Sequence, residues 1–294
     1  MRNTRVELSS QLVALGGCFF IAAFVLALLT VTVKAQEKVT AEQLLNKHLE
    51  SIGTSDARRK NKSHVIFGVC RATFRGRGAG VLTGRAVLAS EDTRNLIGVQ
   101  FNSADYPSEK LGFDGQNFTV GYIKPGIRSV LGNFLIANND VSKEGLIGGA
   151  LSSAWPLRDL SRRNARIEYQ GIERIDNRPL HKVRYMPRKG SDLVITLYFD
   201  VENFRHVRTQ YEKVIAARIG TTVDASAGNR ETRYKLIENF SDFKTEAGLN
   251  LPHTYVLDLF IDTTNGTVAY NYAFSLNQFR FDQELGSEFF NATE

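Results

Sequence analysis

The sequence predicts a mainly β (α+β) protein, a half-open antiparallel β-barrel of about 10–11 strands with an N-terminal helix and a central helical lid insert. Two observations lead to this fold class. Short segments of alternating apolar and polar residues follow one another from residue 64 to residue 276, separated by turns. A soft apolar stretch, EGLIGGALSSAWPL at residues 144–157, interrupts them and contains the chain's single tryptophan, Trp155.

A short amphipathic helix precedes the first strand. Thr40 and Gln43 have the spacing of a capping box. Apolar residues then recur at helical intervals: Leu44, Leu45, Leu49 and Ile52. Gly53 follows as a C-terminal cap, and the apolar stripe predicts that this helix covers part of a core.

Strand-like runs make up most of the remaining chain. They cover residues 64–74, 80–90, 94–103, 111–123, 166–171, 181–185, 194–199, 204–214, 233–240, 253–261 and 268–276. Gly115 and Asn265-Gly266 are strong signals for tight hairpin turns. Consecutive hairpins imply an antiparallel meander, and so many strands must curl or close.

Residues 126–161 break this alternation. Apolar residues at helical spacing run through the segment as far as Pro156: Ile127, Val130, Leu131, Phe134, Leu135, Leu146, Ile147, Leu151 and Trp155. A sheet with one apolar face needs a cover, and the leading helix and this insert are the two candidates. We therefore expect the insert to pack on the inner face of the sheet.

Residues 1–35 have the pattern of a signal peptide or an N-terminal membrane anchor. Arg2 and Arg5 precede an apolar run from Leu12 to Val33, and Ala35 is a small residue at a suitable cleavage site. The run is also long enough to span a bilayer, which takes about 20 residues. With either alternative the rest of the chain, 36–294, is exported as a single domain.

Two cysteines bear on this assignment. Cys18 follows Leu15-Gly16-Gly17 as in a lipobox, but the apolar run continues beyond it, which disfavours lipidation. Cys70 alone follows residue 35, so the exported domain has no internal disulfide available. Its apolar strand context predicts a buried, unreactive side chain.

Charge and motifs exclude several functions. The net charge of +6 is mild and both signs are interspersed, which does not indicate nucleic acid as a partner. We interpret the basic run at residues 58–62 as a solvated loop or helix end. The five histidines lack metal-ligand spacing, and Gly-x-Ser-x-Gly does not occur. We therefore expect neither an enzyme nor a metal or other cofactor.

Several segments together are similar to one known family. They are the helix at residues 41–53, Phe113-Asp114-Gly115, the hairpin at residues 197–208, and residues 240–253. In order and spacing they resemble the LolA/LolB-like superfamily, the outer-membrane lipoprotein-sorting carriers. The resemblance implies a half-open barrel with an apolar cavity that carries acyl chains of lipoproteins, or other lipids, through the periplasm without chemistry.

The resemblance also assigns roles within the insert. The insert would be a lid whose cavity-facing residues are Leu131, Phe134, Leu135, Leu146, Ile147, Leu151 and Trp155. Gly145, Gly148 and Gly149 would allow it to shift. Two features depart from the sorting carriers: the insert itself and a polar loop near residues 224–229. The arginine that holds the carriers' closed lid has no clear counterpart, although Arg128 and Arg158 are candidates.

The sequence thus predicts an exported, periplasmic, monomeric carrier protein for lipid or lipoprotein acyl chains, with transfer partners at the inner or outer membrane. Two alternatives remain open at this stage. The barrel could be filled and act as a non-transporting envelope scaffold or interaction module. A hydrolase would need a site assembled from distant residues.

Overall fold

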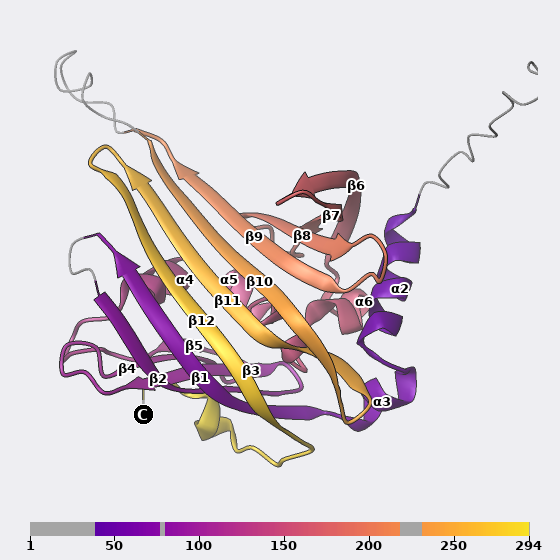
Figure 1. Ribbon diagram of the computed structural model, residues 1–294, viewed down its shortest axis with the longest axis horizontal. Helices are drawn as coiled ribbons and strands as arrows, with labels where there is room; N and C mark the ends of the chain where they lie inside the picture. Colours follow the sequence, from indigo (N-terminus) through magenta and orange to yellow (C-terminus); the bar gives the residue numbers. More distant parts are fainter. Residues whose placement is uncertain (1–38, 77–79, 218–230, 294) are drawn as a thin grey trace, which may run out of the picture. The chain divides into compact units, whose positions relative to one another are not determined.

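Twelve antiparallel strands form one sheet in the computed structural model, which describes residues 39–76, 80–217 and 231–293 (Figure 1). The strands are β1 (Ser63–Arg75), β2 (Gly80–Glu91), β3 (Arg94–Phe101), β4 (Ser108–Phe113), β5 (Phe118–Val120), β6 (Arg166–Ile175), β7 (Arg178–Met186), β8 (Val194–Asp200), β9 (His206–Ile215), β10 (Thr232–Glu246), β11 (Leu249–Thr263) and β12 (Gly266–Phe281). The predicted signal or anchor segment, Cys18 and the polar loop at 224–229 lie outside the described residues.

The strand order explains where the insert must go. It runs β5-β4-β3-β2-β1-β12-β11-β10-β9-β8-β7-β6, so the pairing of β1 with β12 closes the meander in its middle. The two edge strands, β5 and β6, are consecutive in the sequence. Residues 121–165 therefore connect one edge of the open sheet to the other.

The predicted fold class is confirmed, with a difference in strand number. Twelve strands replace the expected 10–11, and the run predicted at residues 111–123 is divided between β4 and the three-residue β5. Asp114 Oδ1 accepts hydrogen bonds from the amides of Gln116 and Asn117, at 2.8 and 2.7 Å, which turns the chain between these strands.

One bulge needs a glycine. The register between β1 and β12 shifts at Phe67/Gly68, and a β-carbon on Gly68 would lie 2.2 Å from the Ser275 carbonyl oxygen. A glycine at such a position lets two backbones approach closely and lets the strand bend.

Apolar side chains line the inner face of the sheet in rows across neighbouring strands. In one row Leu236, Tyr211, Ile195 and Tyr185 are paired in register from β10 to β7, and each is at most 2% exposed. Helix α2 (Ala41–Ile52) has the predicted capping box and buries Leu44, His48 and Ile52; it contacts β11, β6 and the insert. The short helix α3 (Ser55–Lys60) follows it.

The insert is less helical than its periodicity predicts. It contains α4 (Val130–Ala137), α5 (Asp140–Lys143), η1 (Gly149–Leu151), η2 (Pro156–Asp159) and α6 (Leu160–Arg163). The prediction of a helix through residues 146–155 is wrong, because this stretch contains a single 3-10 turn, η1. Gly145, Gly148 and Gly149 all adopt positive φ there, which ends any regular helix.

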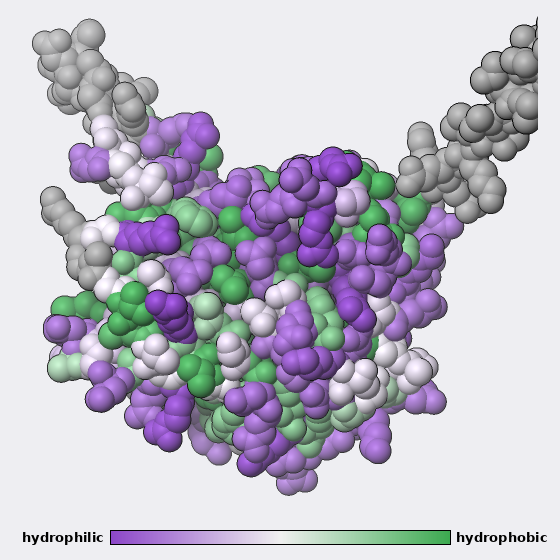
Figure 2. Space-filling view, viewed as in Figure 1, coloured by the Kyte–Doolittle hydropathy of each residue, from purple (hydrophilic) through white to green (hydrophobic). Residues whose placement is uncertain are grey.

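The C-terminal segment covers part of the outer face. Phe290, in the 3-10 turn η3 (Ser287–Phe290), is fully buried against Val65, Ala89 and Leu96 of β1–β3. These three side chains point away from the insert, because the residues next to them along the strands, His64, Ser90 and Asn95, form hydrogen bonds to it. Elsewhere polar and apolar residues are interspersed over the face seen in Figure 2.

Replacing Phe290 with alanine tests whether this segment stabilises the sheet. We expect Phe290→Ala to lower the free energy of unfolding by about 3–5 kcal/mol, because a fully buried ring is lost. The neighbouring Phe289 is 39% exposed, and Phe289→Ala should have a much smaller effect. Urea unfolding of both variants measures the difference, and equal losses would contradict the packing described.

Candidate functional site

All seven predicted lid residues are buried in the structure. Each is at most 5% exposed: Leu131, Phe134, Leu135, Leu146, Ile147, Leu151 and Trp155. The 3-10 turn η1 contacts β9 and β11, α4 contacts β5, and α5 contacts β4. The insert therefore occupies the space that a ligand of the barrel would need.

The central part of the insert leaves almost no free volume beneath it. The space between Ile147 and Leu151 on the insert and Leu88 and Ile97 on the sheet is about 10 Å³. That is at the lower limit for a single water molecule. In this region the interior is packed rather than hollow.

A larger pocket lies beside α4. Its volume is about 250 Å³, and its lining includes Phe134 on α4 and Tyr234 and Ile261 on the sheet. The Phe134 and Tyr234 rings are stacked, with centroids 5.7 Å apart. Val130 and Ile215 line the same pocket and are 37% and 48% exposed, so the pocket opens to solvent through apolar side chains.

Glu238 on β10 binds the backbone of the insert. Its Oε1 accepts hydrogen bonds from the Gly148 amide and the Tyr255 hydroxyl, and its Oε2 accepts one from the Tyr211 hydroxyl, all at 2.7 Å. The residue is fully buried, and burial raises the pKa of Glu238 to about 7. Three donors thus stabilise a carboxylate inside the core and fix the insert at Gly148.

His48 on α2 joins the insert to the β8–β9 hairpin. Its Nε2 accepts a hydrogen bond from Trp155 Nε1 at 3.0 Å, and its Nδ1 lies 3.1 Å from the Phe204 carbonyl oxygen. An indole N–H can only donate, so His48 carries its proton on Nδ1 and donates it to Phe204. Burial lowers the pKa of His48 to about 4, which keeps this neutral form at neutral pH.

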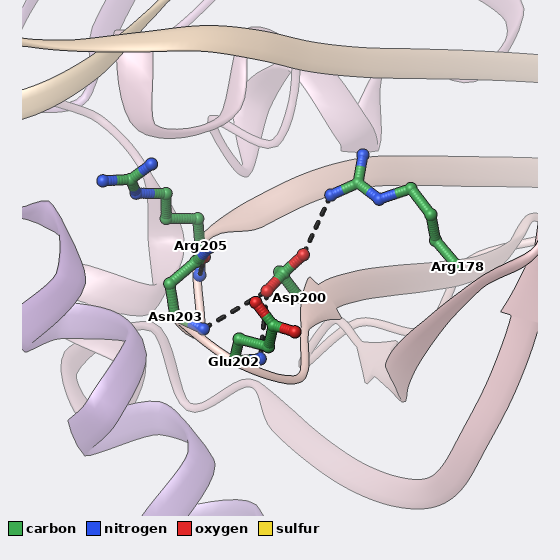
Figure 3. Close-up of polar contacts among 5 residues, drawn as sticks. All are labelled: Arg178, Asp200, Glu202, Asn203 and Arg205. Atoms are coloured by element: carbon green, nitrogen blue, oxygen red, sulfur yellow. Dashed lines mark hydrogen bonds and ion pairs between the residues drawn. The ribbon is translucent and has the colours of Figure 1, made fainter.

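Asp200 shapes the turn that presents this carbonyl group (Figure 3). Its Oδ1 accepts hydrogen bonds from the amides of Glu202 and Asn203 at 3.0 and 3.2 Å, and its Oδ2 accepts one from Arg178 at 2.8 Å. Burial raises the pKa of Asp200, but these bonds outweigh it and leave the pKa below its ordinary value. The turn then places Phe204 at a positive φ of 57° with its carbonyl oxygen towards α2.

Three further polar side chains of the sheet bind the insert's backbone. His64 on β1 donates from Nδ1 to the Leu151 carbonyl oxygen at 2.8 Å. Asn95 on β3 donates to the Ser142 carbonyl oxygen at 3.2 Å, and Ser90 on β2 accepts from the Ser153 amide at 2.8 Å. Residues 142–155 are thus bound to four strands and to α2.

Helix α4 has fewer such bonds. Ser129 caps its first turn by accepting from the Gly132 amide at 2.8 Å, and donates to Glu109 Oε1 on β4 at 2.9 Å. Burial raises the pKa of Glu109 to about 7. At the other end Lys213 on β9 donates to Asn138 Oδ1 at 3.0 Å. Between these two bonds, α4 meets the sheet through apolar contacts.

The two arginines considered as lid-holding residues bind the ends of the insert and its neighbours. Arg128 donates to the Val120 carbonyl oxygen and to the Tyr122 hydroxyl, beside the edge strand β5. Arg158 donates to the carbonyl oxygens of Ser153 and Arg58, which joins the end of the insert to α3. Neither forms a described contact with the inner face of the sheet.

Local sequence patterns did not single out His48, Glu238 or Glu109 as residues of the site. His48 is in fact 1% exposed and central to the site. A signal for Glu238 was present, because it occupies an inward position between Leu236 and Phe240 in an alternating strand. A carboxylate at an apolar position predicts a buried acceptor with assigned donors.

Other expectations concern chemistry. Cys70 is buried as predicted, and burial raises the pKa of its thiol to about 12. In the portion of the chain that the structure describes, no group of three or more histidine, cysteine, aspartate or glutamate side chains is arranged to hold a metal ion. Within the same portion, no helix is long and apolar enough to cross a membrane.

Comparison with known proteins finds solved structures that are similar to this chain. No protein-family model and no curated protein matches the sequence. A LolA superfamily protein from Nitrosomonas europaea is 14% identical, with 86% of this chain and 98% of that chain covered and a TM-score of 0.46. An outer membrane lipoprotein-sorting protein domain from Vibrio parahaemolyticus is 10% identical, with 84% and 97% covered and a TM-score of 0.42.

A DUF1329 family protein from Desulfovibrio piger is 11% identical, with 85% of this chain and 96% of that chain covered and a TM-score of 0.39. The superfamily that the sequence segments resemble is therefore represented among the structures to which this chain is similar.

Two adjacent glycines provide a test of the close fit at the centre of the insert. A β-carbon on Gly149 would lie 2.9 Å from both His206 Nδ1 and Phe240 Cζ, whereas one on Gly148 would meet nothing within 4 Å. Both glycines have positive φ, so either alanine costs roughly 1–2 kcal/mol in backbone strain. We expect Gly149→Ala to cost about 1–3 kcal/mol more than Gly148→Ala in urea unfolding. Equal costs would contradict the fit.

The buried carboxyl of Glu238 predicts a pH effect on stability. Its folded pKa of about 7 lies above the ordinary value of 4.5, so the folded state binds the proton more tightly. The stability that this proton contributes is present below pH 4.5 and is lost as the pH rises to about 7, by up to about 3 kcal/mol. The side chain in Glu238→Gln does not titrate, so this pH-dependent contribution to stability is absent from the variant.

Urea unfolding between pH 4.5 and 8 measures this effect. We expect the stability of the native protein, relative to Glu238→Gln, to fall with rising pH and to level off above pH 7. The exposed Glu168→Gln controls for the loss of a surface carboxylate. A difference between native protein and Glu238→Gln that does not vary with pH would contradict the assignment.

Proposed function

We propose that this protein binds and carries an apolar ligand, a lipid acyl chain, in the pocket between α4 and strands β9–β11. One observation carries the proposal: an open apolar pocket of about 250 Å³ at the one part of the insert that the sheet holds mainly through apolar contacts. Leu131, Phe134 and Leu135 on α4 are then the residues that move or contact the chain.

The energetics favour α4 over the central part of the insert as the moving element. An acyl chain that displaced residues 142–155 would replace the apolar contacts of the insert with its own apolar contacts. The free energy of that exchange is close to zero. It would leave buried groups such as Glu238, His64 and Asn95 without partners, at about 1–3 kcal/mol each. We infer that Leu146, Ile147, Leu151 and Trp155 stay in place while α4 moves.

The pocket's dimensions and charge support a single chain with an acidic end. Ligand pockets usually measure about 300–1,000 Å³, and this one lies just below that range before α4 moves. Lys213 lines the pocket and points its ammonium group to Asn138 and Asp192. A fatty-acyl ligand could place its carboxylate beside Lys213 and its chain along Phe134 and Tyr234.

The setting of this activity is part of the proposal. The signal or anchor pattern in residues 1–35 supports export, and the absence of Cys pairs within the domain is compatible with either redox compartment. A monomeric periplasmic carrier would receive and release its acyl chain at the inner or outer membrane. Such an activity involves no bond making or breaking, so it needs neither a catalytic group nor a cofactor.

The filled interior supports a second candidate, a non-transporting envelope scaffold. The space under Ile147 and Leu151 is about 10 Å³, as expected of a core that never opens. A scaffold would present its outer face to a partner, and a hollow of about 440 Å³ lined by Phe67, Val87 and Lys110 lies there. Failure to bind any acyl chain would favour this candidate.

Blocking the pocket at α4 tests the carrier proposal. Ala137 is exposed, lines the pocket and is the last residue of α4, so Ala137→Trp should fill the pocket without disturbing the core. We expect the native protein to bind a fluorescent long-chain fatty acid saturably and this variant to bind it at least about tenfold more weakly.

The control is Asp140→Trp, which adds the same side chain at a nearby exposed position that does not line the pocket. It should bind the probe as the native protein does. Absence of saturable binding by the native protein, or equal binding by both variants, would contradict the proposal.

A further inference from the structure

A second pocket lies at the end of the insert away from α4 and is strongly basic. Its volume is about 550 Å³, and it is formed where α3, the β2–β3 turn and the η2–α6 segment meet. Five of its lining side chains are cationic: Arg58, Lys62, Arg158, Arg162 and Arg163. Two are acidic, Asp92 and Asp159, so the pocket has a net positive charge.

Two of these arginines are held close together, and neither forms a salt bridge within the described part of the chain. Arg158 donates to the carbonyl oxygens of Ser153 and Arg58, and Arg58 donates to those of Leu49 and Gly53. Burial lowers the pKa of Arg58, and the charge of Glu50 offsets part of this effect. Burial lowers the pKa of Arg158, and the nearby charge of Arg58 lowers it further. Like charges held together in this way are unfavourable unless an anion compensates them.

Ser153 supplies an unused donor at the same place. Its hydroxyl oxygen is buried and has no hydrogen-bond partner among the residues that the structure describes, although Ser153 lines the pocket. Its amide is fixed by Ser90 on β2 at 2.8 Å, so the side chain is held in position. Buried polar groups normally have partners, and an unpaired hydroxyl in a pocket lined by arginines fits an acceptor from a ligand.

We propose that this pocket binds a phosphate-type anion, held by Arg58, Arg158 and the Ser153 hydroxyl, with Lys62 and Arg162 at its rim. The anion belongs either to a lipid headgroup or to a free phosphoryl compound. The site shares no lining residue with the acyl pocket, so it stands whether or not acyl chains bind. The basic run at residues 58–62 thus does more than end a helix, since Arg58 and Lys62 line this pocket.

Trp155 makes the site measurable, because the chain's single tryptophan lines it. We expect titration of the purified protein with inorganic phosphate to change the Trp155 fluorescence saturably. Arg158→Gln should weaken binding by about tenfold or more, since a buried charge-assisted hydrogen bond is lost. Lys62 is exposed, so Lys62→Gln should leave the fold intact. This variant should bind phosphate severalfold more weakly than the native protein.

Arg59→Gln is the matched control, because Arg59 lies on the same helix, is exposed and pairs with Asp56 outside the pocket. It should bind phosphate as the native protein does. Vesicles of phosphatidylglycerol that compete with phosphate would identify a lipid headgroup as the source, and vesicles that do not compete would identify a free phosphoryl compound. No saturable response to phosphate or to vesicles, or equal weakening by Arg59→Gln, Lys62→Gln and Arg158→Gln, would overturn the proposal.

Discussion

The inner face of the sheet contains buried donors and acceptors among its apolar side chains, and the rest of the structure depends on how these are satisfied. Glu238, His64 and Asn95 all find their partners on the backbone of the insert. An apolar cover alone would leave them unpaired, at a cost comparable to a large part of a domain's stability. The insert is therefore a specific hydrogen-bonded element of the fold, joined to both edges of the sheet by the chain itself.

This constraint divides the insert into two parts with different roles. The part around Gly148 and Trp155 is fixed by the sheet and by His48, over almost no free volume. Helix α4 is attached at its ends and lies beside an open apolar pocket. A ligand that displaced α4 would disturb few hydrogen bonds. The glycines at 145, 148 and 149 supply the positive φ angles of the fixed part, and we do not expect them to act as hinges.

Much of the fold follows from local sequence. Alternation predicted the strands, the capping box at Thr40 predicted α2, and apolar spacing identified the insert and its buried residues. The site depended on contacts that local patterns do not encode. His48 and Trp155 are 107 residues apart in the sequence, and no periodicity relates them. The helical spacing of Leu146 to Trp155 was misleading because three glycines with positive φ override it. The inward position of Glu238 was a readable signal.

Hydrogen–deuterium exchange with and without a long-chain fatty acid shows which part of the insert moves. We expect amides of α4, residues 130–137, to change their protection when the ligand binds, and those of residues 144–157 to keep theirs. The Gly148 amide is the most informative, because Glu238 holds it. Loss of protection across 144–157 on binding would contradict the assignment of α4 as the moving element, since the centre of the insert would then be the moving lid. Unchanged exchange in both segments would equally contradict it.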